Sequence, residues 1–306
     1  MNVRDWALIT FTILAEMSVG AFWVLGAVHY FSARKAGAEQ ADRLSDRALL
    51  AIVPVLALGV LASLLHLGNP LNAYRSVTHL STSWLSREVL STVLFLVVGG
   101  VFAFMQWKKI ASFAVRNVLA WIAALIGLFL VYSMSNVYLL PTQPAWNTMA
   151  TPVSFFTTTL LLGVLAVGAA FVANYAYIKR AAPDCADIQC VLLRGSLRWF
   201  AVASVILLGV ELVVTPLYLA YLSAEGGAAA ASAAMMYGKF GVVLGLRLVF
   251  VVVGAGVLAL FLYQNALSPG RERVMGNLAY AAFSLVLVSE VLGRFLFYAT
   301  HVRIGV

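Results

Sequence analysis

Three ionisable residues near the ends of apolar segments have side chains suited to proton chemistry at a membrane edge. His66 ends the apolar run 48–66, and Arg87 and Glu88 open the run 87–106. Ionisable groups are costly inside a bilayer, so their presence there suggests a function. Structural explanations also exist: His66 as a helix-end residue bonded to a loop carbonyl, and Glu88 as a carboxylate in the first turn of a helix, where the helix dipole favours it.

A second set of polar residues lies along the last apolar run and just beyond it. Glu290, Arg294, Tyr298 and His301 are spaced by four, four and three residues, which predicts one stripe along a helix. Alternatively, Glu290 and Arg294 form only a structural ion pair along that helix.

Three more charged residues lie inside other apolar runs. Arg247 lies near the start of the run 241–264, where its side chain could simply reach the membrane interface. Glu16 and Glu211 lie nearer mid-membrane, where neutral carboxyls bonded between helices are the structural alternative.

Oxidation of a quinol at the membrane edge suits such groups. It needs an apolar slot for the ring, a carboxylate or imidazole to accept the hydroxyl protons, and a cation or donor to hold the oxygens. A short loop joins His66 to Glu88, and we expect these two residues to accept the protons. The further candidates for the quinol pocket are Arg87, Arg247, Glu290, Arg294 and Tyr298.

Metal chemistry has less support. Two haems would need about four axial histidines paired across helices, whereas the chain has only 4 His, at scattered positions. We therefore expect neither haem nor metal in this chain. Cys185 and Cys190 match no common zinc spacing, and we expect them to be ordinary loop thiols.

The composition excludes a soluble globular protein. Hydrophobic residues make up 63% of the chain and charged residues 10%, against about a quarter charged in soluble domains. The net charge of +8 could suggest nucleic acid, but the basic residues lie in short loops between apolar runs. That pattern is typical of membrane topology, and we expect no nucleic-acid partner.

Eight apolar runs are long enough to cross a membrane as helices: 6–30, 48–66, 87–106, 117–140, 153–178, 199–222, 241–264 and 276–299. The sequence therefore predicts an all-α, polytopic membrane protein in which residues 1–306 form a single helical bundle domain. Segment 32–50 carries charges of both signs and is expected to be a solvated connector or a short surface helix.

Basic residues predict the orientation. Most of them lie in the loops after the first, third, fifth and seventh runs, which the positive-inside rule places in the cytoplasm. Both termini are therefore expected outside. The residues on the predicted inner side are Arg34, Lys35, Arg43, Arg47, Lys108, Lys109, Arg116, Lys179, Arg180, Arg194, Arg198, Arg271 and Arg273.

Four segments resemble one known family. SLLHLGNPLNAYRSV (63–77) and SWLSREVLS (83–91) are similar to the second-to-third helix region of the dimethyl sulfoxide reductase membrane-anchor family. VYLLPTQPAWNTMATPVSFF (137–156) resembles its fourth-to-fifth connection, and SEVLGRFLFYATH (289–301) resembles its C-terminal segment. The likeness spans the whole chain.

The resemblance implies an eight-helix, haem-free subunit in the cytoplasmic (inner) membrane of a prokaryote, with a role in electron transport and anaerobic respiration. Its expected partners are a molybdopterin catalytic subunit and an iron–sulfur subunit with [4Fe-4S] clusters. Such a subunit oxidises menaquinol or a related quinol such as ubiquinol. The family associates quinol binding with residues that match His66 and Glu88 here, and the C-terminal match adds Glu290 and Arg294 as further site residues.

Three alternatives stay open. Segment 83–88 also resembles anchors of sulfite-oxidising complexes, in which electrons enter the quinone. The other two are a secondary transporter, with helices broken near Pro54 or Pro216, and an anchor that positions its partners without touching quinone.

Overall fold

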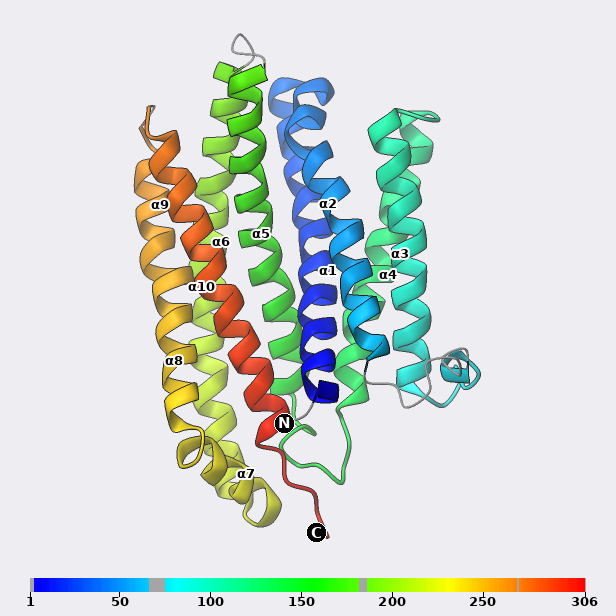
Figure 1. Ribbon diagram of the computed structural model, residues 1–306, viewed down its shortest axis with the longest axis vertical. Coiled ribbons are helices and arrows are strands. Elements are labelled where there is room, and N and C mark those ends of the chain that lie inside the picture. Colours follow the sequence, from blue (N-terminus) through cyan, green and yellow to red (C-terminus); the bar gives the residue numbers. More distant parts are fainter. Residues whose placement is uncertain (1–2, 66–74, 182–185, 269, 306) are drawn as a thin grey trace.

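The computed structural model describes residues 3–65, 75–181, 186–268 and 270–305 of the 306. Long helices run side by side in these ranges (Figure 1). They are α1 (Val3–Ala36), α2 (Ala38–Leu64), α3 (Trp84–Lys108), α4 (Phe113–Val137), α5 (Ala150–Ala181), α6 (Ala186–Glu225), α7 (Gly227–Tyr237), α8 (Gly241–Val251), the π-helix η3 (Val252–Leu258), α9 (Ala259–Asn265) and α10 (Glu272–Ala299).

Eight helical segments within the described ranges are long and apolar enough to cross a membrane. Each overlaps one predicted run, and the seventh is formed by α8, η3 and α9 together. The all-α fold and the number of spans are therefore confirmed. Both termini lie at one end of the bundle, with α7 and the loop 138–149; we call this the termini end (Figure 1).

The segment between the first two spans differs from the expected connector. Only Gly37, with φ of 86°, separates α1 from α2, so residues 38–47 are the first turns of α2. Glu39 and Arg43 form an i,i+4 pair there, which favours helix. The charge pattern of this segment thus belongs to a spanning helix that continues beyond the predicted run.

Two further features were not predicted. The alanine-rich α7 lies in the loop between the sixth and seventh spans, and its 11 residues are too few to cross a membrane, which takes about 20. The π-helix η3 interrupts the seventh span. By contrast, α2 continues through Pro54 and α6 through Pro216, so the breaks that the transporter alternative requires do not occur at these prolines.

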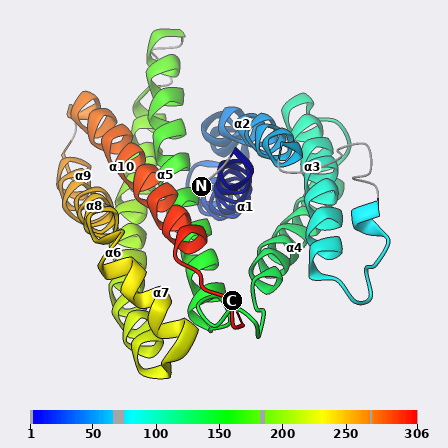
Figure 2. The same ribbon diagram turned by 60° about the horizontal axis from the view of Figure 1, so that its bottom comes forward.

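Helices α1 and α5 form the centre of the bundle. Seen with the termini end forward, α2, α3 and α4 lie on one side of α1, and α5 to α10 lie on the other (Figure 2). Gly20 of α1 and Gly163 of α5 bring the two backbones into contact. A Cβ built on Gly20 would lie 1.8 Å from the Thr159 carbonyl oxygen, and one on Gly163 would lie 2.3 Å from the Gly20 carbonyl carbon. Such glycine contacts allow close helix packing in lipid.

A polar network joins α1, α2 and α3 at the end opposite the termini. Lys109, just after α3, forms ion pairs with Asp42 and Asp46 of α2, at 2.7 and 2.8 Å. His29 of α1 lies 2.8 Å from Asp42, and Gln106 of α3 also donates to both carboxylates. This network fixes the relative positions of these helices at their ends.

We predict that Gly20→Ala destabilises the protein by at least the ~1–3 kcal/mol typical of overpacking, because the new methyl group would collide with backbone that cannot move separately from α5. Thermal unfolding of the purified protein in detergent measures the effect. Gly26→Ala is the matched control on the same helix, since its Cβ meets nothing within 4 Å. Equal melting temperatures for the two variants would contradict the close contact.

Candidate functional site

The polar stripe of the last span is buried inside the bundle. Glu290, Arg294 and Tyr298 are respectively 3%, 5% and 9% exposed on α10, the helix along which their spacing predicts one stripe. His301 lies beyond the end of the helix, where its ring stacks on Trp146 at 4.3 Å between centroids. The stripe therefore holds three buried groups, and His301 belongs to the aromatic cover at the termini end.

Arg294 forms an ion pair with Glu16 of α1. One guanidinium nitrogen, Nη2, lies 2.6 and 2.7 Å from the two carboxylate oxygens, and both side chains are almost completely buried. The guanidinium also lies 3.7 Å from the ring centroid of Phe155 on α5. The alternative of a Glu290–Arg294 pair along α10 is wrong, because the cation faces α1 and Thr158 donates to Glu290 at 2.7 Å.

Glu88 lies on the other side of this ion pair. Helix α3 begins at Trp84, capped by Ser83, so Glu88 lies in the second turn and not in the first, where the dipole effect is greatest. Its side chain is buried and interacts electrostatically with Glu16, Tyr138 and Tyr298. No cation of the described residues forms a salt bridge with it.

Two tyrosines and several aromatic rings surround this group at the termini end. The hydroxyl groups of Tyr138 and Tyr298 share a buried hydrogen bond. Trp146, in the α4–α5 loop, stacks on Phe297 and donates to its carbonyl at 2.8 Å. The loop that resembles the family's fourth-to-fifth connection thus covers the end of α10 and helps to position Tyr298.

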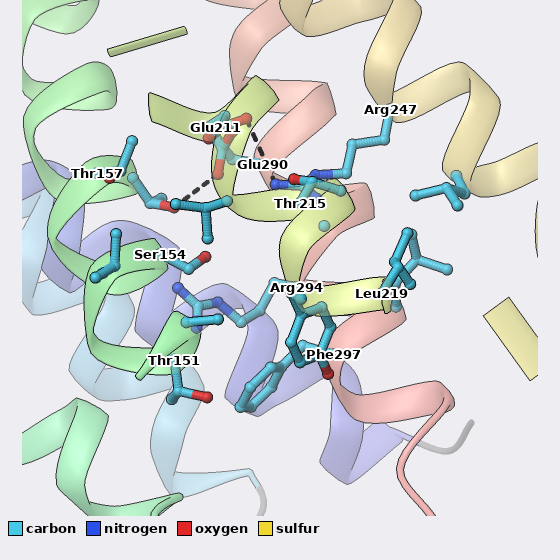
Figure 3. A pocket seen from close by; sticks show the side chains of 18 of the residues that line it. Thr151, Ser154, Thr157, Glu211, Thr215, Leu219, Arg247, Glu290, Arg294 and Phe297 are labelled. Atoms are coloured by element: carbon cyan, nitrogen blue, oxygen red, sulfur yellow. Dashed lines mark hydrogen bonds and ion pairs between the residues drawn. The ribbon is translucent and has the colours of Figure 1, made fainter. Parts of the chain in front are cut away.

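Arg247 enters a separate polar cavity. Its Nη2 lies 3.5 Å from Glu211 Oε2, and the Glu211 carboxyl is also in contact with that of Glu290 (Figure 3). Gly293 makes room for the guanidinium, because a Cβ there would lie 2.6 Å from Arg247 Nε. Arg247 therefore bonds between helices and does not extend to the interface.

The cavity has a volume of about 90 Å³ and is formed by α5, α6, α7, α8 and α10. Figure 3 shows charged groups and hydroxyl groups around it. Its polar lining residues are Thr151, Ser154, Thr157, Thr158, Glu211, Thr215, Tyr218, Arg247, Glu290 and Arg294. Arg294 thus separates this cavity from Glu88.

Arg87 takes no part in either group. Its guanidinium donates to the carbonyls of Leu80 and Ser81 at 2.8 Å and lies 4.2 Å from the Trp84 ring centroid. It also lines an apolar groove between α3 and α4. These contacts fix the loop before α3, so the structure does not bring Arg87 to the other candidates.

The other sequence-predicted residues divide into two groups. His66 and Cys185 lie outside the described residues. Glu16 and Glu211 are indicated by the sequence only as mid-membrane carboxyls, although each is the partner of a candidate arginine. Within the described ranges, no three His, Cys, Asp or Glu side chains are grouped as metal ligands.

Across the described ranges, eight apolar helical segments with charges buried among them define a multi-pass membrane protein. The sequence model of the family described as DMSO reductase anchor subunit (DmsC) matches residues 1–300. The protein therefore belongs to this family of membrane anchor subunits.

Three relatives match almost the full length of the protein. It is 27% identical over 303 residues to the C chain of anaerobic dimethyl sulfoxide reductase from Escherichia coli. It is 28% identical over 305 residues to the YnfH chain of an anaerobic dimethyl sulfoxide reductase from the same organism. It is 25% identical over 305 residues to the corresponding C chain from Haemophilus influenzae. Each alignment covers 99% of this protein and 96 or 97% of the relative.

We predict that Glu16→Gln destabilises the protein by about 3–5 kcal/mol, because it leaves the buried Arg294 without its counter-charge. The double variant Glu16→Gln/Arg294→Met should be less destabilised than the sum of its single variants. Thermal unfolding of all three in detergent measures this coupling.

Glu39→Gln is the matched control for the same measurement. It breaks the ion pair with Arg43, in which the Glu39 side chain is 76% exposed, and exposed pairs contribute at most about 1 kcal/mol. Simple additivity of the single variants at positions 16 and 294 would contradict the buried pair.

Proposed function

We infer that this protein is the membrane anchor of a molybdopterin oxidoreductase complex in the cytoplasmic membrane of a prokaryote. Family membership supports the anchor role, and the names of the three relatives support a complex of the dimethyl sulfoxide reductase type. The partners would be an iron–sulfur subunit and a molybdopterin catalytic subunit. The anchor would oxidise menaquinol or ubiquinol and pass the electrons to the iron–sulfur subunit.

The position of Glu88 carries the proposal of quinol oxidation. A buried carboxylate without a cationic partner gains from accepting a proton, because the neutral acid is less costly to bury. The paired Tyr138 and Tyr298 hydroxyls provide polar groups beside it. The surrounding aromatic rings provide an apolar environment suited to a quinol ring.

In this mechanism the quinol loses two electrons and two protons and leaves as the quinone. Glu88 accepts one hydroxyl proton and His66 the other, as their residue types and the family resemblance suggest. Arg294 stays protonated and paired with Glu16, so this neutral pair holds α1 and α10 together beside the site. Glu88 lies near the termini end of α3, so the iron–sulfur subunit would dock at that end, close enough to receive the electrons.

The first prediction of this proposal concerns the composition of the complex. Purified from native membranes in mild detergent, the protein should bring with it two soluble subunits that contain molybdenum and iron–sulfur clusters, without haem. Metal analysis and mass spectrometry measure this, and the catalytic subunit identifies the substrate. A sulfite-oxidising partner would reverse the direction of electron flow, and a lone protein without metal would refute the anchor role in this complex.

The second prediction concerns Glu88. In the assembled complex, Glu88→Gln should reduce quinol-driven turnover to below about one hundredth, because the amide cannot accept the proton. Activity driven by a reduced dye that donates directly to the soluble subunits should not change. Glu39→Gln, an exposed carboxyl at the opposite end of the bundle, is the matched control. Normal quinol-driven turnover in the Glu88 variant would exclude this assignment.

A further inference from the structure

We propose that Glu211 and Glu290 share one proton in a water-filled cavity and exchange it with the termini end along the hydroxyl groups of α5. This cavity is a second proton site, separated from Glu88 by the Arg294–Glu16 pair. Its role as an exit for protons from quinol rests on the function proposed above. Its capacity to hold a proton depends only on the groups in the cavity.

The charges in the cavity do not balance without a proton. Glu16 uses both carboxylate oxygens to bind Arg294, so this pair is neutral by itself. Arg247 then faces two carboxyl groups, those of Glu211 and Glu290. An uncompensated charge inside a membrane protein is costly. One added proton makes the group of three neutral.

The contact between the two carboxyls supports a shared proton. Glu211 and Glu290 point toward each other from α6 and α10 (Figure 3). Two ionised carboxylates in contact repel each other, whereas an acid and a carboxylate form a strong hydrogen bond. Thr158 donates to Glu290 Oε2, and Arg247 Nη2 lies 3.5 Å from Glu211 Oε2.

Two polar atoms of the cavity are available to bind water. Glu290 Oε1 and Arg247 Nε are buried, and neither has a hydrogen-bond partner in the described part of the chain. The Glu290 side chain that carries this atom is 97% buried, since its exposure is 3%. A water molecule needs about 10–15 Å³ of cavity volume, so the cavity of about 90 Å³ has room for several water molecules. Water there would hydrogen-bond to both atoms.

Hydroxyl groups lead from the carboxyl pair toward the termini end. Thr151, Ser154 and Thr158 are spaced by three and four residues on α5, and all three line the cavity. This spacing places them on one face of the helix. Thr158 donates to Glu290, and Thr151 lies in the first turns of α5, where it donates to the carbonyl of Trp146. Together with water, this face offers a route for proton transfer.

Infrared difference spectra between the wild-type complex and each variant complex test the shared proton. The band of a protonated carboxylic acid, identified by its shift in D₂O, should disappear in Glu211→Gln and also in Glu290→Gln. Either single variant leaves one carboxylate opposite Arg247, and that carboxylate needs no proton. The band should remain in Glu88→Gln. Loss of the band in only one of the two variants, or in neither, would overturn the proposal.

Quinol-driven turnover of the complex tests the role of the cavity as an exit for protons. Glu211→Gln and Glu290→Gln should each slow quinol-driven turnover at least about tenfold, with no further loss in the double variant, because the residues act as a unit. Dye-driven activity should not change, because the dye donates directly to the soluble subunits. Wild-type turnover in both variants would overturn the exit role.

Aspartate variants provide the control for shape and folding. Glu211→Asp and Glu290→Asp keep the acid, so they should keep the infrared band and most of the turnover. If they assemble and lose turnover as completely as the glutamine variants, side-chain shape and not the proton is responsible. The infrared result is independent of quinol, so a failure of the Glu88 assignment would not hide a failure here.

Discussion

The contact between Gly20 of α1 and the backbone of α5 is the constraint on which the rest of the bundle depends. Lipid provides no hydrophobic force between helices, so close packing has to hold them together. Here α1 and α5 meet without side chains between them, and the other helices pack around this pair. Larger residues at these positions would separate the helices and move every side chain that faces the centre.

The same contact determines where the buried charges lie. Three residues in one short stretch of α5 have separate roles: the carbonyl of Thr159 meets Gly20, the hydroxyl of Thr158 bonds Glu290, and the ring of Phe155 lies against Arg294. Since α5 is held against α1, Arg294 of α10 reaches Glu16 across the same junction. Helix packing and charge pairing thus support each other, and a change in one alters the other.

The sequence predicted the spans well because hydropathy and length suffice for that purpose. It also predicted the buried stripe from Glu290 to Tyr298, since helical spacing places these residues on one face. The sequence did not predict which charged residues pair with each other. Arg294 has a carboxyl four residues away on its own helix, yet its partner is Glu16, 278 positions distant. Spacing reports neighbours on one helix, whereas partners on different helices depend on packing that a single sequence does not reveal.

Arg294 also explains why one membrane protein can hold two acidic sites close together. Arg294 and Glu16 form an ion pair without net charge. Arg294 is therefore not the counter-charge of Glu88 or of Glu290. Arg247 is the remaining cation among these groups in the described part of the chain, and it lies nearest Glu211. With fewer cations than carboxyls in a medium of low dielectric, protons are the counter-charges that remain. An excess of buried carboxyls is therefore the physical basis of the proton uptake proposed for Glu88 and for the pair of Glu211 and Glu290.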